Sequence, residues 1–347
     1  MHLVSAQDNS LFDQIRGAQA IAPSSIEERG AVHALEPVVR LETESKVWRV
    51  VKDFLCVLFV LPLVYRGIRA VISWFVVEST SYSIEGAANV RRHNQGAWQS
   101  LTNEGWQIKR FTIEVNGMAI DAVIVSKPDT INNGRWILHS TGNAGCYEDG
   151  LASVRCFEQM QSNLLMFNYP GVIASTGNPH ASALAESYQA CLEVLENREW
   201  GIGATEIIGY GLSLGSGVQA EALMTHEFQE NIRYLFIKDQ SYTRLVDVIA
   251  GLMCRCVGWI VQLFGNNLNV IESSCRLHEQ GITEIIMEAQ DDWLMTPAIR
   301  LFANLPEAEK ASKVHITYEG QHGTPFPVQE LAQRVNAWIE QEQQLAS

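Results

Sequence analysis

The sequence predicts an α/β fold in which a mostly parallel central sheet carries helices on both faces. Residues 111–125 have the pattern of two alternating strands joined by Asn116-Gly117, a dipeptide that favours a tight hairpin turn. After this hairpin, apolar strand patterns alternate with segments of helical spacing up to a last helix at 328–341. Such alternation is typical of parallel strands joined by helices, and ligands then bind at the carboxyl ends of the strands.

The elements expected after the hairpin are short buried strands and amphipathic helices. We expect strands at 135–139, 163–168, 206–210, 234–237, 282–288 and 315–318. We expect helices at 148–161, 181–196, 216–224, 297–305 and 328–341. A long apolar stretch at 243–265 has helical character, and we expect it to form a lid over the sheet, bounded at about 243–270.

By composition the chain divides into three parts. Residues 1–45 are a polar extension, residues 46–80 are an apolar segment, and residues 81–347 carry the α/β pattern after a polar connector. A chain of 347 residues with 47% apolar content is long enough to bury a large core. The extension lacks a basic start followed by an apolar run, so we expect no cleavable signal peptide.

The apolar segment holds two runs, at 54–65 and 70–77. The first is shorter than the about 20 residues that span a bilayer. Joining the runs would place Arg66 and Arg69 near the middle of a span, where each charge costs about 2.5–3.5 kcal/mol. We therefore expect residues 54–77 to contact a membrane as a hairpin or an interfacial helix pair; the alternative is an apolar helix pair that caps the core.

The net charge limits the kind of partner that the protein can bind, and the cysteines indicate its compartment and whether it holds a metal. A net charge of −14 argues against nucleic acid, because phosphate binding needs a basic face. The seven cysteines are odd in number, and the close pair Cys254 and Cys256 lacks the spacing of a paired metal site. We expect reduced, mostly buried thiols, which indicate a reducing compartment, and no metal or organic cofactor.

One motif carries chemistry. The segment 209–217 (GYGLSLGSG) contains Gly-x-Ser-x-Gly between an apolar strand and a helix. In this setting Ser213 sits at a sharp turn, and Gly211 and Gly215 avoid collisions with the turn. The helix that follows directs backbone N–H groups and its positive dipole end at a developing oxyanion. The pattern predicts that Ser213 is a nucleophile, and the alternative is a glycine-rich turn that only packs closely.

A second loop suits an oxyanion hole. The strand at 136–139 leads into 140–145 (STGNAG), and in folds with this nucleophile turn one oxyanion N–H comes from the loop after that strand. The other comes from the residue after the nucleophile. We therefore expect the N–H groups of Asn143 and Leu214 to serve as donors; the alternative is a glycine loop that caps the next helix.

The general base and its orienting acid should follow the serine in the chain, in the order acid and then histidine. His322 follows the strand at 315–318 in a loop with Gly320 and Gly323, so it can reach a serine at the same sheet edge. The acid should follow the strand at 282–288, where Asp291 and Asp292 are adjacent. We favour Asp292, with Asp291 as the near alternative and Asp239 as a weaker one; an unused aspartate would be a helix cap or first-turn charge.

From Phe111 onward the sequence resembles the α/β-hydrolase superfamily. The loop 141–145 (TGNAG) is similar to the His-Gly-Asn-Ala-Gly loop of membrane-anchored protein depalmitoylases, with Thr141 in place of histidine. The stretch 168–177 (NYPGVIASTG) is similar to their Tyr-x-Gly-x-Gly-x-Ser-x-Gly loop, with Ile173 where glycine is usual. The whole chain resembles the Chlamydia CHLPS-type hydrolases and related Legionella secreted effectors, which implies a bacterial serine hydrolase exported into a host cell.

We therefore expect a serine hydrolase that cleaves an ester or thioester. The apolar segments at 54–77 and 244–264 point to an acyl or lipid-like small molecule, or an acylated protein, presented at a membrane. The same residues would support a peptidase or an acyltransferase. A non-catalytic effector or binding scaffold that retains the fold is the alternative from another class.

Overall fold

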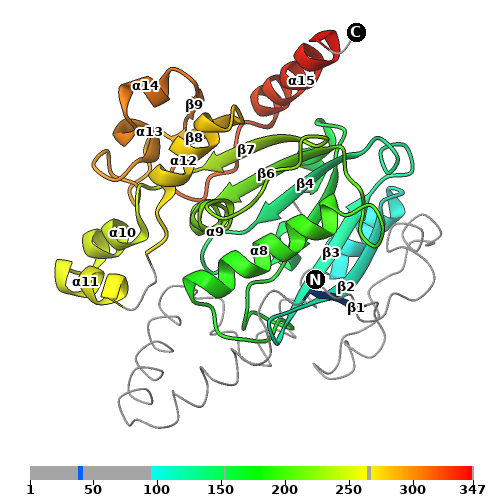
Figure 1. Ribbon diagram of the computed structural model, residues 1–347, viewed down its shortest axis with the longest axis horizontal. Helices are drawn as coiled ribbons and strands as arrows, with labels where there is room; N and C mark the ends of the chain where they lie inside the picture. The colour runs from blue at the N-terminus through cyan, green and yellow to red at the C-terminus, as the bar shows by residue number, and fades with distance from the viewer. Residues whose placement is uncertain (1–37, 42–94, 152–153, 264–266, 346–347) are drawn as a thin grey trace.

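The structure is a computed structural model that describes residues 38–41, 95–151, 154–263 and 267–345. Within these residues, a nine-stranded sheet has the order β1-β2-β3-β5-β4-β6-β7-β8-β9 (Figure 1). The strands are β1 (Val38–Leu41), β2 (Gln107–Val115), β3 (Met118–Ser126), β4 (Arg135–Ser140), β5 (Asn163–Phe167), β6 (Glu206–Leu212), β7 (Arg233–Asp239), β8 (Thr283–Ala289) and β9 (Val314–Tyr318). The strand β3 pairs antiparallel with β2 and β5, and the other pairs are parallel.

The antiparallel start of the sheet follows from the turn that the sequence predicts. Asn116 and Gly117 join β2 to β3, and both have positive φ, at 49° and 82°. This is the backbone of the tight hairpin turn for which Asn-Gly is favoured. The strand β1 adds a parallel edge beside β2, so residues 38–41 of the predicted polar extension belong to the sheet.

Helices cover both faces of the sheet. The helices are α6 (Tyr147–Gly150), α7 (Val154–Glu158), α8 (Ala181–Glu196), α9 (Leu214–Leu223), α10 (Leu245–Leu252), α11 (Arg255–Leu263), α12 (Val270–Glu279), α13 (Leu301–Asn304), α14 (Glu307–Lys310) and α15 (Val328–Leu345), and residues 95–103 are also helical. The helices α8, α9 and α12 pack side by side on one face (Figure 1), and α7 and α15 pack together on the other.

Successive residues of a strand belong to two separate hydrophobic cores, one on each face of the sheet, because side chains alternate between the faces. Ile207 and Phe236 belong to the core under α8 and α9. Their neighbours Ile208 and Leu235 belong to the core under α7 and α15. Burial on both faces explains why the central strands read as continuous apolar runs.

Several helical segments differ from the sequence prediction, among them α14 and the helix at 95–103, which were not predicted. The helix expected at 148–161 is divided into α6 and α7, and the one expected at 297–305 is reduced to the short α13. The helix α12 was not predicted as a separate element. Its residues are polar on average and only Val270, Ser273, Ser274 and Leu277 are buried, which leaves a narrow apolar stripe.

The predicted lid consists of two short helices, α10 and α11, which lie at one end of the molecule (Figure 1). Large apolar side chains are exposed on them, namely Leu252, Met253, Trp259, Ile260 and Leu263. Cys254, between the helices, and Cys256, in the first turn of α11, form a disulfide with a Cα–Cα distance of 5.5 Å. The expectation of reduced thiols therefore does not hold for this pair, because the turn brings the two side chains within bonding reach.

The predicted membrane contact at 54–77 lies outside the described residues. Among the helices that the structure describes, none combines the length and the apolar character that a membrane crossing needs.

The strand order reverses direction at β4. The chain leaves β4 to form β5 on one side of it, and then returns to form β6 on the other side. At such a reversal the loops after the two neighbouring strands diverge and leave a space at their carboxyl ends. The loop after β4 and the turn after β6 therefore meet at this edge.

Candidate active site

Ser213 occupies the sharp turn between β6 and α9. Its backbone has φ 50° and ψ −112°, a region that is sparsely populated for residues other than glycine. Its N–H donates a hydrogen bond to the carbonyl oxygen of Asp239, at 2.8 Å, which ties the turn to the end of the neighbouring strand β7. The turn is thus held from β7, and the serine side chain projects from the sheet edge.

The two glycines of the motif are required by close backbone contacts. A Cβ atom on Gly211 would lie 2.8 Å from the carbonyl oxygen of Gly215, and one on Gly215 would lie 2.3 Å from the carbonyl oxygen of Ser140. Real Cβ atoms do not approach other atoms so closely, so larger residues would force the turn and β4 apart. The glycine pattern is therefore explained by the contact between the turn and the end of β4.

His322 lies between the serine and an aspartate. Its Nε2 is 3.1 Å from Ser213 Oγ, and its Nδ1 is 2.8 Å from Asp292 Oδ2. The three residues come from the ends of β6, β8 and β9, which the parallel sheet brings to one edge. This is the arrangement in which an imidazole can take a hydroxyl proton while a carboxylate fixes its tautomer.

Asp292 is held in an environment that favours its charged form. Its Oδ1 accepts hydrogen bonds from the N–H groups of Leu294 and Met295, both at 2.9 Å. Burial acts to raise the pKa of this carboxyl, but the hydrogen bonds from His322 and Met295 outweigh it and lower the pKa below its ordinary value. The neighbouring Asp291 is exposed, and its N–H bonds to the carbonyl oxygen of Gly320.

Asp239, the third aspartate considered from the sequence, is buried behind the site. Its carboxylate accepts hydrogen bonds from the hydroxyls of Tyr210, at 2.6 Å, and Tyr318, at 2.8 Å. Burial raises its pKa to about 6, although the two tyrosines act in the opposite direction. Its oxygens are thus engaged by tyrosines, whereas Asp292 is the carboxylate bonded to the imidazole.

The predicted oxyanion loop lies directly beside the turn that carries Ser213. A Cβ atom on Gly215 would also meet the carbonyl oxygen of Thr141 at 2.7 Å, and that oxygen accepts a hydrogen bond from the buried hydroxyl of Tyr169 at 2.6 Å. Asn143 is exposed, and its side-chain oxygen accepts the N–H of Ala144. Leu214 begins α9 after β6, and Asn143 lies in the loop after the neighbouring strand β4.

A network of buried polar side chains, which the sequence did not reveal, holds α6, the helix that follows this loop. Asp121 pairs with Arg110 through two bonds of 2.6 Å and accepts the hydroxyl of Tyr147. Asn168 accepts the N–H of Tyr147 and donates to Glu148, so it connects α6 to the loop after β5. Burial and nearby Asp121 raise the pKa of Glu148 to about 7. These residues are far apart in the sequence, so they form no motif that a reading of the sequence could detect.

The resemblance noted at 168–177 has a structural counterpart. Ile173, which stands where glycine is usual, has φ 50° and is 1% exposed. Positive φ is unfavourable for a β-branched residue, which explains why glycine is preferred there. The isoleucine side chain instead joins the core under α8.

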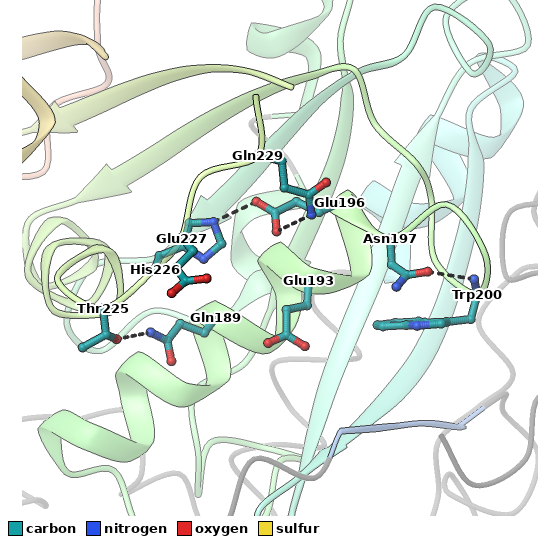
Figure 2. A pocket seen from close by; sticks show the side chains of 9 residues that line it. All are labelled: Gln189, Glu193, Glu196, Asn197, Trp200, Thr225, His226, Glu227 and Gln229. Atoms are coloured by element: carbon teal, nitrogen blue, oxygen red, sulfur yellow. Dashed lines mark hydrogen bonds and ion pairs between the residues drawn. The ribbon is translucent and has the colours of Figure 1, made fainter. Parts of the chain in front are cut away.

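A separate polar cavity of about 380 Å³ lies at the C-terminal ends of α8 and α9 (Figure 2). Figure 2 shows Glu196 beside His226, and these side chains are 2.8 Å apart; the hydroxyl of Tyr234 also donates to Glu196. Ten residues of α9 separate this cavity from Ser213, which corresponds to roughly 15 Å of helix. None of the site residues expected from the sequence lines it.

Comparison with solved structures defines the class of fold. An esterase from Pyrococcus furiosus matches with a TM-score of 0.52 and 12% identity, over 70% of this chain and 94% of the esterase. An alpha-beta hydrolase from Vibrio vulnificus matches with a TM-score of 0.54 and 14% identity, over 72% of this chain and 85% of that protein. The chain therefore has the α/β-hydrolase fold, as the sequence predicted.

A family comparison narrows this class. The model of the family described as Chlamydia CHLPS protein (DUF818) matches residues 34–296, which is most of the chain. The chain belongs to this family. No curated protein matches the chain significantly.

Proposed function

We propose that the protein is a serine hydrolase that cleaves an ester or thioester. The single observation that supports this most strongly is the chain of contacts from Ser213 Oγ to His322 Nε2 and from His322 Nδ1 to Asp292 Oδ2. Three side chains from distant parts of the sequence meet in the order that acyl transfer needs. In the cavity at α8 and α9, the hydroxyl of Thr225 bonds to Gln189 and the imidazole of His226 bonds to Glu196, so the described contacts there do not join a hydroxyl to an imidazole.

The proposed reaction has two halves. His322 takes the proton of Ser213 as the oxygen attacks the acyl carbon, and then delivers it to the departing alcohol or thiol. Water, deprotonated by the same imidazole, then releases the acid and restores the serine. In both halves the N–H groups of Leu214 and Asn143 stabilise the oxyanion, and Asp292 holds the imidazole tautomer.

The substrate we propose is an acyl or lipid-like molecule, or an acylated protein. The exposed apolar side chains of α10 and α11 support this, because such a surface can receive an acyl chain or contact lipid. To test the class, hydrolysis of acyl esters of rising chain length is compared with thioesters and peptide amides. Faster cleavage of the amides than of every ester and thioester would favour a peptidase instead.

A fluorophosphonate probe tests the nucleophile directly, because it bonds covalently to activated serines. We expect the wild-type protein to be labelled and Ser213→Ala to be unlabelled with an unchanged melting temperature. Ser182→Ala, at an exposed serine in α8, is the matched control and should label normally. A wild-type protein that stays unlabelled while other serine hydrolases react would favour the alternative, a non-catalytic scaffold.

We also propose that residues 54–77 hold the protein at a membrane, and that the protein acts in a host cell. Removal of residues 1–80 should then move it from a membrane fraction to the supernatant. A reporter enzyme fused to the chain and active only in host cytoplasm tests export. An unchanged fractionation would reject the anchoring role, and a silent reporter would reject the export.

A further inference from the structure

Gln240 joins the nucleophile turn to the loop that carries His322. It follows β7 directly, is 1% exposed, and has a positive φ of 49°. Its own N–H donates to the carbonyl oxygen of Met287 at 2.8 Å, which continues the parallel ladder between β7 and β8. The left-handed backbone is unusual for glutamine, so the surrounding structure must hold it in place.

The side chain of Gln240 contacts the His322 loop at the two residues that follow the histidine. Its Oε1 accepts the N–H of Gly323 at 2.7 Å, and its Nε2 donates to the carbonyl oxygen of Thr324 at 3.1 Å. The Nε2 also donates to the hydroxyl of Tyr318 at 2.6 Å. An N–H only donates and a carbonyl only accepts, so these partners determine which way the amide points.

The contacts continue from Gln240 to the nucleophile. The hydroxyl of Tyr318, which accepts from Gln240, donates to Asp239 Oδ1 at 2.8 Å. Asp239 is the residue before Gln240, and its carbonyl oxygen accepts the N–H of Ser213 at 2.8 Å. Two consecutive residues at the end of β7 thus bond to the backbone of both the serine and the histidine loop.

Close to the histidine the loop has few other contacts in the described structure; Phe326, further along, packs against Phe157 and Tyr210. Gly323 has φ 84° and is exposed, and the side chain of His322 retains 17% exposure. Within the loop, Gln321 and Thr324 bond to each other, and the N–H of Asp291 bonds to Gly320 before the histidine. Asp292 orients the ring through a single bond to Nδ1. This bond does not fix the distance between the ring and Ser213, which therefore depends on the position of the loop backbone.

We propose that Gln240 is a positioning residue that sets the distance between His322 and Ser213 by clamping the backbone at Gly323 and Thr324. It touches neither reacting atom and acts through the loop. The inference rests on the proposed hydrolase function, because the distance matters only if His322 removes the proton of Ser213. A displacement of about 1 Å in such a geometry can reduce the rate about 100-fold.

Gln240→Met tests the clamp because it keeps the length of the side chain and removes the amide. We expect kcat for p-nitrophenyl butyrate to fall about 10–100-fold, with KM within about twofold. The low-field proton resonance of the His322 N–H bonded to Asp292 should weaken or shift. Gln189→Met is the control, since it also removes a hydrogen-bonded amide, here one that bonds to Ala222 and Thr225 away from the serine. It should leave all three readouts unchanged.

The outcomes separate this inference from the proposed function. If the wild type is labelled and active and Gln240→Met is equally active, the positioning role of Gln240 is overturned and the proposed hydrolase function stands. A rise in KM with unchanged kcat in Gln240→Met has the same meaning. A wild type without labelling or hydrolysis overturns the hydrolase itself. If Gln240→Met does not fold, Gln240→Asn is the deciding variant. Asparagine tolerates positive φ, but its side chain is one methylene too short to keep the bonds to both Gly323 and Thr324. A wild-type kcat in Gln240→Asn would overturn the clamp.

Discussion

Asp292 Oδ2 lies 2.8 Å from His322 Nδ1, while the adjacent Asp291 is exposed and bonds through its backbone to Gly320. The two aspartates therefore form a natural comparison. Asp292→Asn should lower kcat by about 10³–10⁴-fold, because an amide that donates to Nδ1 would hold the imidazole in the wrong tautomer. Asp291→Asn should change kcat by less than about threefold. Equal losses in steady-state ester hydrolysis for both variants would contradict this assignment.

Gly215 is the contact point between the nucleophile turn and β4. Gly215→Ala places a Cβ 2.3 Å from the carbonyl oxygen of Ser140. We therefore expect the free energy of unfolding to fall by about 1–3 kcal/mol or more. Gly251→Ala in α10 is the control, because no atom lies within 4 Å of its added Cβ. That variant should gain up to about 1 kcal/mol from helix propensity. Urea denaturation of both proteins measures the difference, and a stable Gly215→Ala would contradict the close contact.

Ile173 combines a buried side chain with a strained backbone, and substitutions can separate the two effects. Removing its side chain should cost about 2–5 kcal/mol, which exceeds the about 1–2 kcal/mol of strain that glycine would relieve. Both Ile173→Gly and Ile173→Ala should therefore be less stable than wild type. The glycine variant should be the more stable of the two, which reverses the usual order. Chemical denaturation gives the ranking, and a more stable alanine variant would argue against positive φ at this position.

Glu148 should make stability depend on pH, because burial and Asp121 raise its pKa from 4.5 to about 7 in the folded chain. The stability contributed by the neutral carboxyl is fully present below pH about 4.5 and is lost as pH rises to about 7. Glu148→Gln remains neutral, so its advantage over wild type should grow by about 1–3 kcal/mol between pH 5 and pH 8. Melting curves at both pH values test this, with the exposed Glu199→Gln as control. A constant difference between variant and wild type would exclude the titration of Glu148.

Local patterns were informative where one short segment contains the whole signal. Asn116-Gly117 predicted the hairpin because the turn type depends on the φ of two adjacent residues. The glycines around Ser213 predicted the sharp strand-to-helix turn for the same reason, since their contacts lie within a few residues and at the end of one neighbouring strand. The helix at 181–196 was predicted with the bounds that α8 has in the structure, because its apolar face is continuous.

Patterns failed where an element depends on distant partners. The helix expected at 148–161 is divided, and Asn168 and Asp121, which bond to the first part, lie elsewhere in the chain. The strand β1 forms in a segment of mixed polarity because β2 offers an unpaired edge. Gln240 carries no local signal, since glutamine in a loop is usually a solvated residue.

The sequence by itself determined the α/β architecture, the turn that carries Ser213 and the small set of residues that could serve as base and acid. Periodicity and turn chemistry are local properties, so they can be read along the chain. Only the tertiary structure shows that Asp292, and not Asp291, bonds to His322. It also shows that Asp239 bonds to two tyrosines and that Gln240 bonds to the loop after His322. The order of strands in the sheet brings these residues together, and hydrogen bonds across strand ends select one carboxylate from several that are alike in sequence.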